Sequence, residues 1–119
     1  MFANPRMRVA QSMAERVGHF AAREIRRSRE AIEGAQGMEP RQRALALLGP
    51  LRKKARAQGL WCPFIPKEYG GMGLGPLANA LVQMELGESI LGALSMNTQG
   101  PDDASMMTLL AHGTEYQKE

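Results

Sequence analysis

The sequence has little of the material from which several classes of protein are built. Its single cysteine, Cys62, excludes an internal disulfide and fits a reducing compartment. Six aromatic side chains in 119 residues leave few rings on which nucleic-acid bases would stack. No apolar run approaches the roughly 20 residues that span a bilayer, and the N-terminal segment lacks the apolar core of a signal peptide. We therefore expect a cytoplasmic protein with no membrane span and no nucleic-acid partner.

Charge is divided unequally along the chain. Residues 1–58 carry thirteen Lys/Arg and five Asp/Glu, a balance of +8. Residues 59–119 carry two Lys/Arg and seven Asp/Glu, a balance of −5. The basic half predicts either solvated helix faces, a contact between subunits or an acidic partner.

Apolar residues recur at helical spacing in the first half, and no strand pattern is convincing. Asn4, a good cap, and Pro5, suited to the first helical position, predict a first helix over about 5–32. A second helical segment starts at Pro40, and Gly49-Pro50 is expected to interrupt it, because proline disfavours a helical residue before it. Gly59 predicts a left-handed stop. The expected fold class is all-α, with about five helical segments in one domain.

The second half starts with a loop and continues as shorter helices. Residues 60–75 combine prolines and glycines with apolar residues, which predicts a loop packed against the body of the protein. Pro76 predicts the start of a third helix. Thr114 and Gln117 fit a capping box, so another helix is expected to begin where the sequence ends. The predicted buried face of the third helix consists of Leu77, Leu81, Val82, Met84 and Leu86.

Few side chains are placed for chemistry. His19 and His112 are far apart, and each is interpreted as a surface residue. Cys62 has no evident base nearby, which favours an inert thiol over a nucleophile. Glu85 and Glu88 are interpreted as a structural or exposed pair rather than an acid/base pair. Two aspartates, Asp102 and Asp103, fit the first turn of a helix better than a metal site. The sequence therefore predicts no catalytic residue and no metal ligand.

A glycine-rich run follows the loop. Gly71, Gly73 and Gly75 do not form a G-x-G-x-x-G phosphate turn, because Pro76 takes the last position and no strand precedes the run. A turn that brings the apolar loop close to a helix explains the glycines better.

Three segments carry a family resemblance. The run GLW…PKEYGGMGL, residues 59–74, resembles the GL…P-x-x-YGG-x-G signature of the N-terminal helical domain of the acyl-CoA dehydrogenase family. NTQGPD, residues 97–102, and GTEYQK, residues 113–118, resemble the next two landmarks in the same order. The resemblance covers about 59–119, whereas residues 1–58 agree only in helical character and in the stop at Gly59.

The resemblance implies a three-domain flavoenzyme, with a helical N-terminal domain, a middle β-domain and a C-terminal helical bundle, in a homodimer or tetramer. It implies FAD as cofactor, acyl-CoA as substrate and an electron-transfer flavoprotein as acceptor. The catalytic glutamate of such enzymes belongs to the C-terminal bundle. Residues 1–119 would then be an incomplete N-terminal domain, truncated before the β-domain, inactive by itself and with no FAD contact that can be assigned.

The resemblance also implies a binding role for three residues. It places Met96 and Gly100 where the family often closes the deep end of the acyl pocket, with Ala104 a further turn on. Their spacing of four residues puts them on one face if the helix is continuous, which Pro101 opposes. Glycine would leave the pocket open, which predicts a long or bulky acyl group. Alternatively, Gly100 only serves the turn before Pro101.

Two other functions stay open. The chain is alternatively a non-enzymatic helical interaction module whose basic half docks an acidic partner. It is alternatively part of a relative with different chemistry, such as an acyl-CoA oxidase. In isolation we expect the chain to self-associate or to be molten, because apolar faces would lack their cover.

Overall fold

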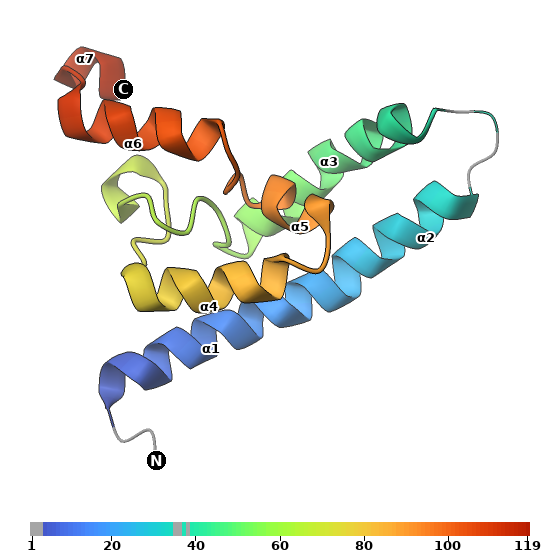
Figure 1. Ribbon diagram of the computed structural model, residues 1–119, viewed down its shortest axis with the longest axis horizontal. Helices are drawn as coiled ribbons and strands as arrows, with labels where there is room; N and C mark the ends of the chain where they lie inside the picture. Colours follow the sequence, from blue (N-terminus) through green and yellow to red (C-terminus); the bar gives the residue numbers. More distant parts are fainter. Residues whose placement is uncertain (1–3, 35–36, 38) are drawn as a thin grey trace.

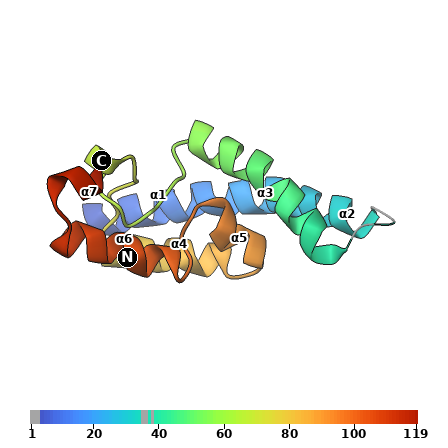
Figure 2. The ribbon, with the colours of Figure 1, turned by 90° about the horizontal axis from the view of Figure 1, so that it is seen from above.

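The computed structural model describes residues 4–34, 37 and 39–119 of the chain. All regular structure in this part is helical, as expected, and the elements form a flat slab of 46 × 44 × 21 Å (Figures 1 and 2). None of the described helices is long and apolar enough to cross a membrane. The elements are α1 (Pro5–Phe20), η1 (Ala21–Ile25, a π-helix), α2 (Arg26–Gly34), α3 (Pro40–Ala57), η2 (Lys67–Tyr69, a 3₁₀ turn), α4 (Pro76–Leu86), α5 (Ile90–Ser95), α6 (Asp102–His112) and α7 (Glu115–Lys118).

The elements α1, η1 and α2 form one continuous rod, which confirms the predicted first helix (Figure 1). Its start is fixed locally: the Asn4 side chain accepts a hydrogen bond of 2.9 Å from the backbone N–H of Arg6, and Pro5 takes the first helical position. The rod buries one apolar stripe, as the spacing predicts. The buried apolar residues of this stripe are Ala10, Ala14, Val17, Phe20 and Ile25.

The π-helical turn η1 buries a charge that the sequence pattern did not reveal. A π turn inserts an extra residue, and here Glu24 and Ile25 both lie on the buried side. Glu24 is only 7% exposed, and its carboxylate oxygens lie 2.6 Å from Lys54 Nζ and 3.2 Å from Arg23 Nε. The hydrogen bond from Lys54 is the main cause that lowers the pKa of Glu24, against the opposing effect of burial. This contact ties the rod to α3.

The predicted interruption at Gly49-Pro50 is wrong, because α3 runs through both residues to Ala57. Gly49 and Pro50 are exposed. The carbonyl that loses its partner at Pro50 therefore lies on the solvent side, where water can satisfy it and where the ring causes less disruption. The opposite side of α3 is buried through Leu51 and Ala55.

The predicted stop at Gly59 is confirmed. Gly59 has φ of 71°, and its N–H donates to the Arg56 carbonyl at 3.0 Å. The N–H of Leu60 donates to the Ala55 carbonyl at 2.9 Å. This paired pattern is the Schellman motif, which satisfies the last carbonyls of a helix.

The loop 60–75 packs against the body of the protein, as predicted, through Leu60, Cys62, Ile65 and Met72. Beside it α4 lies parallel to α1, and this is the most extensive helix pair of the molecule (Figure 1). The core joins the rod, α3, the loop, α4 and α5. Its buried members are Val17, Phe20, Ile25, Leu51, Ala55, Leu60, Met72, Val82, Leu86, Leu91 and Met96.

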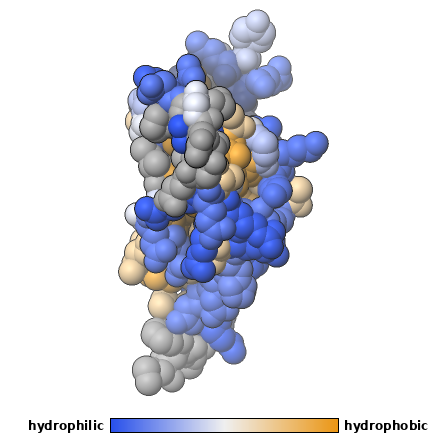
Figure 3. Space-filling model, turned by 90° about the vertical axis from the view of Figure 1, so that its right-hand side faces the viewer, coloured by the Kyte–Doolittle hydropathy of each residue, from blue (hydrophilic) through white to orange (hydrophobic). Residues whose placement is uncertain are grey.

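The buried face predicted for α4 is only partly correct. Val82 and Leu86 are buried, but Leu77 is exposed and Met84 is 74% exposed. The slab is only 21 Å thick, so a helix of this layer is covered on some sides and open on the others. Viewed from the end where α2 and α3 meet, hydrophilic side chains cover most of the surface (Figure 3).

Candidate functional site

A groove of about 420 Å³ lies between α4, the loop 60–75 and α6. Asn79 and Gln83 of α4 form one wall, and Ala104 and Met107 of α6 form the other. Phe64, Thr98 and Asp103 complete the lining. In Figure 1 the loop lies between α4 and α6, on the side of α4 away from α1.

Hydrogen bonds within the groove hold its polar side chains. Gln83 Nε2 donates to Thr98 Oγ1 at 2.6 Å and lies 3.5 Å from Asn79 Oδ1. Asp103 Oδ1 accepts a hydrogen bond of 2.8 Å from the backbone N–H of Ala104, at the start of α6. The polar groups are therefore engaged with one another or with a helix terminus. The lining of the groove contains no paired acid and base.

Of the three predicted binding residues, the structure places one in this groove. Ala104 is exposed in the groove wall, Met96 is 0% exposed in the core, and Gly100 lies exposed in the turn before α6. The helix is not continuous here, as Pro101 indicated, because α5 ends at Ser95 and α6 begins at Asp102. The three residues therefore do not share one helix face.

The link from α5 to α6 is fastened to the loop by Cys62 and Asn97. Both adopt left-handed backbone conformations, with φ of 43° and 51°. The N–H of Cys62 donates to the Met96 carbonyl at 2.9 Å, and Asn97 Nδ2 lies 3.5 Å from Cys62 Sγ. Burial raises the pKa of the Cys62 thiol, so the reactive thiolate is disfavoured. These contacts favour the structural interpretation of Cys62 over a nucleophile.

The glycine-rich run packs closely against the preceding part of the loop. A Cβ on Gly71 would lie 2.1 Å from the Ile65 carbonyl oxygen, so only glycine fits there. The N–H of Gly71 donates to Pro66 at 3.2 Å, and that of Gly73 donates to Ile65 at 2.8 Å. Because loop carbonyls take these N–H groups, the run does not fit the pyrophosphate of FAD. No flavin contact is assigned to it.

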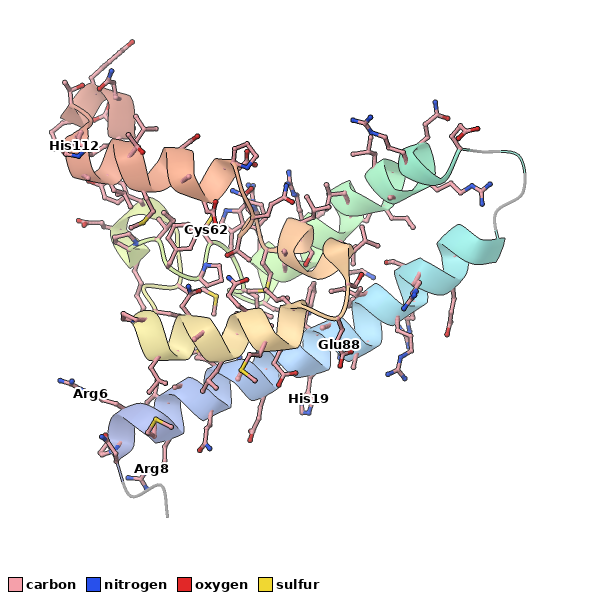
Figure 4. The ribbon with its side chains drawn as sticks, viewed as in Figure 1. Arg6, Arg8, His19, Cys62, Glu88 and His112 are labelled. Carbon is pink, nitrogen blue, oxygen red and sulfur yellow. The ribbon has the colours of Figure 1, made fainter. Side chains whose placement is uncertain are left out.

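The two histidines lie far apart, and Glu85 and Glu88 line another hollow together with Arg26 and Arg29. Figure 4 shows His19 on the lower side of the molecule and His112 at the end of α6. Both histidines, Glu85 and Glu88 are exposed. Among the described residues, no three His, Cys, Asp or Glu side chains lie together in an arrangement that could hold a metal ion.

Sequence reasoning missed most of the groove lining. Asn79 and Gln83 lie four residues apart on a helix whose one other polar residue is Glu85, which is a usable signal for a polar strip facing a site. The contributions of Phe64 and Thr98 depend on how the loop and the α5–α6 link fold, and no local pattern identifies them.

Comparison with known proteins agrees with the family resemblance. Residues 9–119 match the family model described as "Acyl-CoA dehydrogenase, N-terminal domain". The chain is 28% identical over 114 residues to Acyl-CoA dehydrogenase family member 10 of Mus musculus, which covers 91% of this chain and 11% of that protein. It is 35% identical over 81 residues to Acyl-CoA dehydrogenase family member 11 of Gallus gallus, which covers 68% of this chain and 10% of that protein.

The chain thus spans about a tenth of the length of these curated relatives. No solved structure matches it significantly. The family match covers the rod, the glycine loop and the groove, so that the residues that carry the resemblance lie in one folded unit. The chain belongs to the acyl-CoA dehydrogenase N-terminal domain family.

Proposed function

We propose that this chain is the N-terminal helical domain of an FAD-dependent enzyme that introduces an α,β double bond into an acyl-CoA thioester. The family match over residues 9–119 supports this proposal. The greater length of the relatives fits a parent protein with a β-domain and a C-terminal bundle. An electron-transfer flavoprotein as acceptor, a homodimer or tetramer, and a cytoplasmic location belong to the same proposal.

The proposed role of the domain is to form one wall of the acyl pocket. The observation that carries this role is the groove between α4 and α6, with Ala104 in its wall and the apolar side chains of Phe64 and Met107 beside it. Burying an acyl chain against such a wall is favourable by about 0.8 kcal/mol for each CH₂ group removed from water. The wall would therefore select substrates by length and bulk.

The proposal also assigns Gly100 to the deep end of this pocket, as the family resemblance implies. A Cβ on Gly100 would meet only Asp103 Oδ1, at an ordinary contact distance of 3.8 Å. Asp103 itself lines the groove. A larger side chain at Gly100 therefore has room and would extend toward the groove, whereas glycine leaves space for a long or bulky acyl group.

The chemistry requires removal of the α-proton and transfer of the β-hydride, and FAD supplies the hydride acceptor when it is bound in the parent protein. The groove offers neither a base for the α-proton nor an acceptor for the hydride. Its one carboxylate, Asp103, accepts the N–H of Ala104. The contribution of these residues is to position the acyl chain and exclude water from it, and the isolated chain would be inactive.

The test is made in the full-length protein with Gly100→Leu and Ala104→Leu. One methylene in an apolar pocket changes discrimination by about 1–3 kcal/mol, so kcat/KM for long substrates should fall at least tenfold while short substrates are spared. Ser105→Leu is the matched control, because Ser105 is exposed on α6 but lies outside the groove lining. A chain-length profile identical to that of the control would contradict the pocket role.

Flavin absorbance separates the chemistry from the pocket assignment. Anaerobic addition of acyl-CoA to the full-length protein should bleach the flavin if the enzyme is a dehydrogenase. No bleaching would contradict the proposed reaction, and rapid reoxidation of the reduced flavin by oxygen would favour an acyl-CoA oxidase.

A further inference from the structure

A second hollow, of about 430 Å³, lies where α3 ends and meets the glycine loop. It shares no lining residue with the groove. Its lining brings together one guanidinium, two aromatic rings and three glycines, contributed by Arg56, Gly59, Trp61, Tyr69, Gly70 and Gly71.

The guanidinium of Arg56 lies over Trp61, with its Cζ 4.0 Å from the ring centroid. Two nearby arginines use their donors within the protein: Arg16 Nη2 donates to the Gln58 carbonyl at 2.7 Å, and Arg52 Nε donates to the Leu94 carbonyl at 3.0 Å. Among the described residues, no hydrogen bond or ion pair reaches the Arg56 guanidinium. This cation–π contact holds the guanidinium at the ring, and its five N–H donors stay available to an anion.

The rest of the hollow suits a flat ring. Tyr69 and Trp61 both line the hollow. Tyr69 is 40% exposed, and Trp61 is half-buried. Gly59 and Gly70 have no side chains, and a Cβ on either would meet nothing within 4 Å. The space above the glycine backbone is therefore open. Aromatic faces bordering such a space are stacking platforms for a base, worth about 1–3 kcal/mol per base.

The charge at the hollow favours an anion. None of the six lining residues is acidic. The last turns of α3 carry Lys53 and Arg56, whereas Lys54 is paired with Glu24. Arg52 also lies near Trp61, at 5.8 Å from the ring centroid. Glu68 directly precedes Tyr69 in the loop but does not line the hollow.

We propose that this hollow binds an adenine nucleotide, with the base against Tyr69 and the phosphates on the Arg56 guanidinium, which lies over Trp61. A bare anion would leave the rings without a role, and an uncharged ring would leave the Arg56 donors unused. The volume lies within the range of about 300–1,000 Å³ that small-molecule sites occupy. The inference does not rest on the proposed dehydrogenase function, because it concerns a separate set of residues.

The test uses ADP as the probe and two independent readouts. Trp61 is the single tryptophan of residues 1–119, so in this chain, once circular dichroism shows that it is folded, its emission reports on the hollow; dialysis can also be made with the full-length protein. We expect ADP to quench this emission saturably when excitation avoids the adenine band, and equilibrium dialysis to give the same affinity. Adenosine and inorganic pyrophosphate, which each lack half of the ligand, should bind at least tenfold more weakly.

Variants locate the site. Arg56→Gln removes a charged donor, and hydrogen bonds to charged groups contribute about 1.5–3 kcal/mol, so dialysis should show ADP binding weakened tenfold or more. Tyr69→Leu should weaken ADP and adenosine alike. Arg8→Gln is the matched control: Arg8 is an exposed arginine of α1 that is absent from the lining of the hollow, and Figure 4 shows it at the opposite end of the rod from α2. Circular dichroism establishes that each variant is folded.

Four results would overturn the proposal. Three of them are the absence of saturable ADP binding to the folded protein, equal weakening by Arg56→Gln and Arg8→Gln, and pyrophosphate binding as tight as ADP. Tighter binding of a single-stranded oligonucleotide than of ADP would also overturn it, in favour of nucleic acid. If coenzyme A binds more tightly than ADP, the site is supported and its natural ligand is the nucleotide part of coenzyme A. If both bind with equal affinity, the site is supported and its natural ligand is a free nucleotide.

Discussion

The first helix of the rod and α6 have similar apolar spacing but differ in burial. In α1 the residues Ala10, Ala14 and Val17 are buried against neighbouring elements. In α6 no residue is buried, and Met107 at the centre of its apolar line is 52% exposed. The difference lies in what faces each helix: α1 lies along the full length of α4, whereas α6 contacts the short α7 and lies above the loop 60–75 without being buried by either (Figure 1).

This contrast separates two properties that a sequence pattern combines. Spacing determines which side chains share one face of a helix. Burial requires a second surface that covers this face, and the described part of the chain provides that surface for α1 but not for α6. We therefore expect the rod, α3 and α4 to unfold as one unit and α6 to open at a lower free-energy cost.

The largest effect should come from the core. Phe20 of the rod is almost fully buried, and Phe20→Ala should lower the free energy of unfolding by about 3–5 kcal/mol, since it removes a ring and leaves a cavity. Leu109→Ala in α6 is the control, because this leucine is partly exposed, and it should cost less than about 1 kcal/mol. Urea denaturation measures both, and similar losses would remove the contrast between the two regions.

An intermediate effect should come from the buried carboxylate of the rod. Glu24→Gln removes the ion pair with Lys54 and should lower the free energy of unfolding by about 1–3 kcal/mol at neutral pH. Because the folded state lowers the pKa of Glu24, this stabilisation is complete above the unfolded pKa and disappears as the pH falls through the folded pKa. The difference between wild type and variant should therefore shrink in acid.

The exposed Glu30 of α2 provides the control for this measurement. Glu30→Gln should leave the free energy of unfolding nearly unchanged across the same pH range. A difference between wild type and Glu24→Gln that persists in acid would show that the carboxylate charge is not what stabilises the contact between η1 and α3.

The smallest effects should test whether the two regions share one unfolding transition. Gly49→Ala in α3 places a methyl group in open space at a helical position and should stabilise the protein by about 0.5–1 kcal/mol. Thr108→Ala also raises helix propensity, in α6, by up to about 0.7 kcal/mol. We expect only Gly49→Ala to raise the midpoint of global unfolding, while hydrogen exchange in α6 slows in Thr108→Ala. A raised midpoint in both would show that α6 is part of the main unit.

Local signals predicted the parts of the fold whose causes are local. Pro5 opens a helix, Gly59 ends one, and the Thr114–Gln117 capping box forms with both of its hydrogen bonds. These features depend on a few neighbouring residues. The glycine signature was recognised as a pattern, but the reason for Gly71, its contact with the Ile65 carbonyl, required the folded loop.

The errors come from interactions between distant segments. Pro50 continues a helix because its ring faces solvent, and that orientation is set by what α3 buries on its other side. Glu24 is buried because Lys54, thirty positions later, reaches it. Whether Met96 and Ala104 would share a helix face was left open by Pro101, and the turn between α5 and α6 separates them. None of these outcomes is encoded within one turn of helix.

The reciprocal contact between Cys62 and Asn97 has a consequence for how the groove can vary. It joins the loop that supplies Phe64 to the link that supplies Thr98, so this one contact, called the latch below, couples the positions of both segments. A ligand too wide for the groove cannot displace either segment alone. Related chains that accept broader ligands would therefore have to change both ends of the latch together, or enlarge the groove through side chains such as Met107 that the latch does not hold.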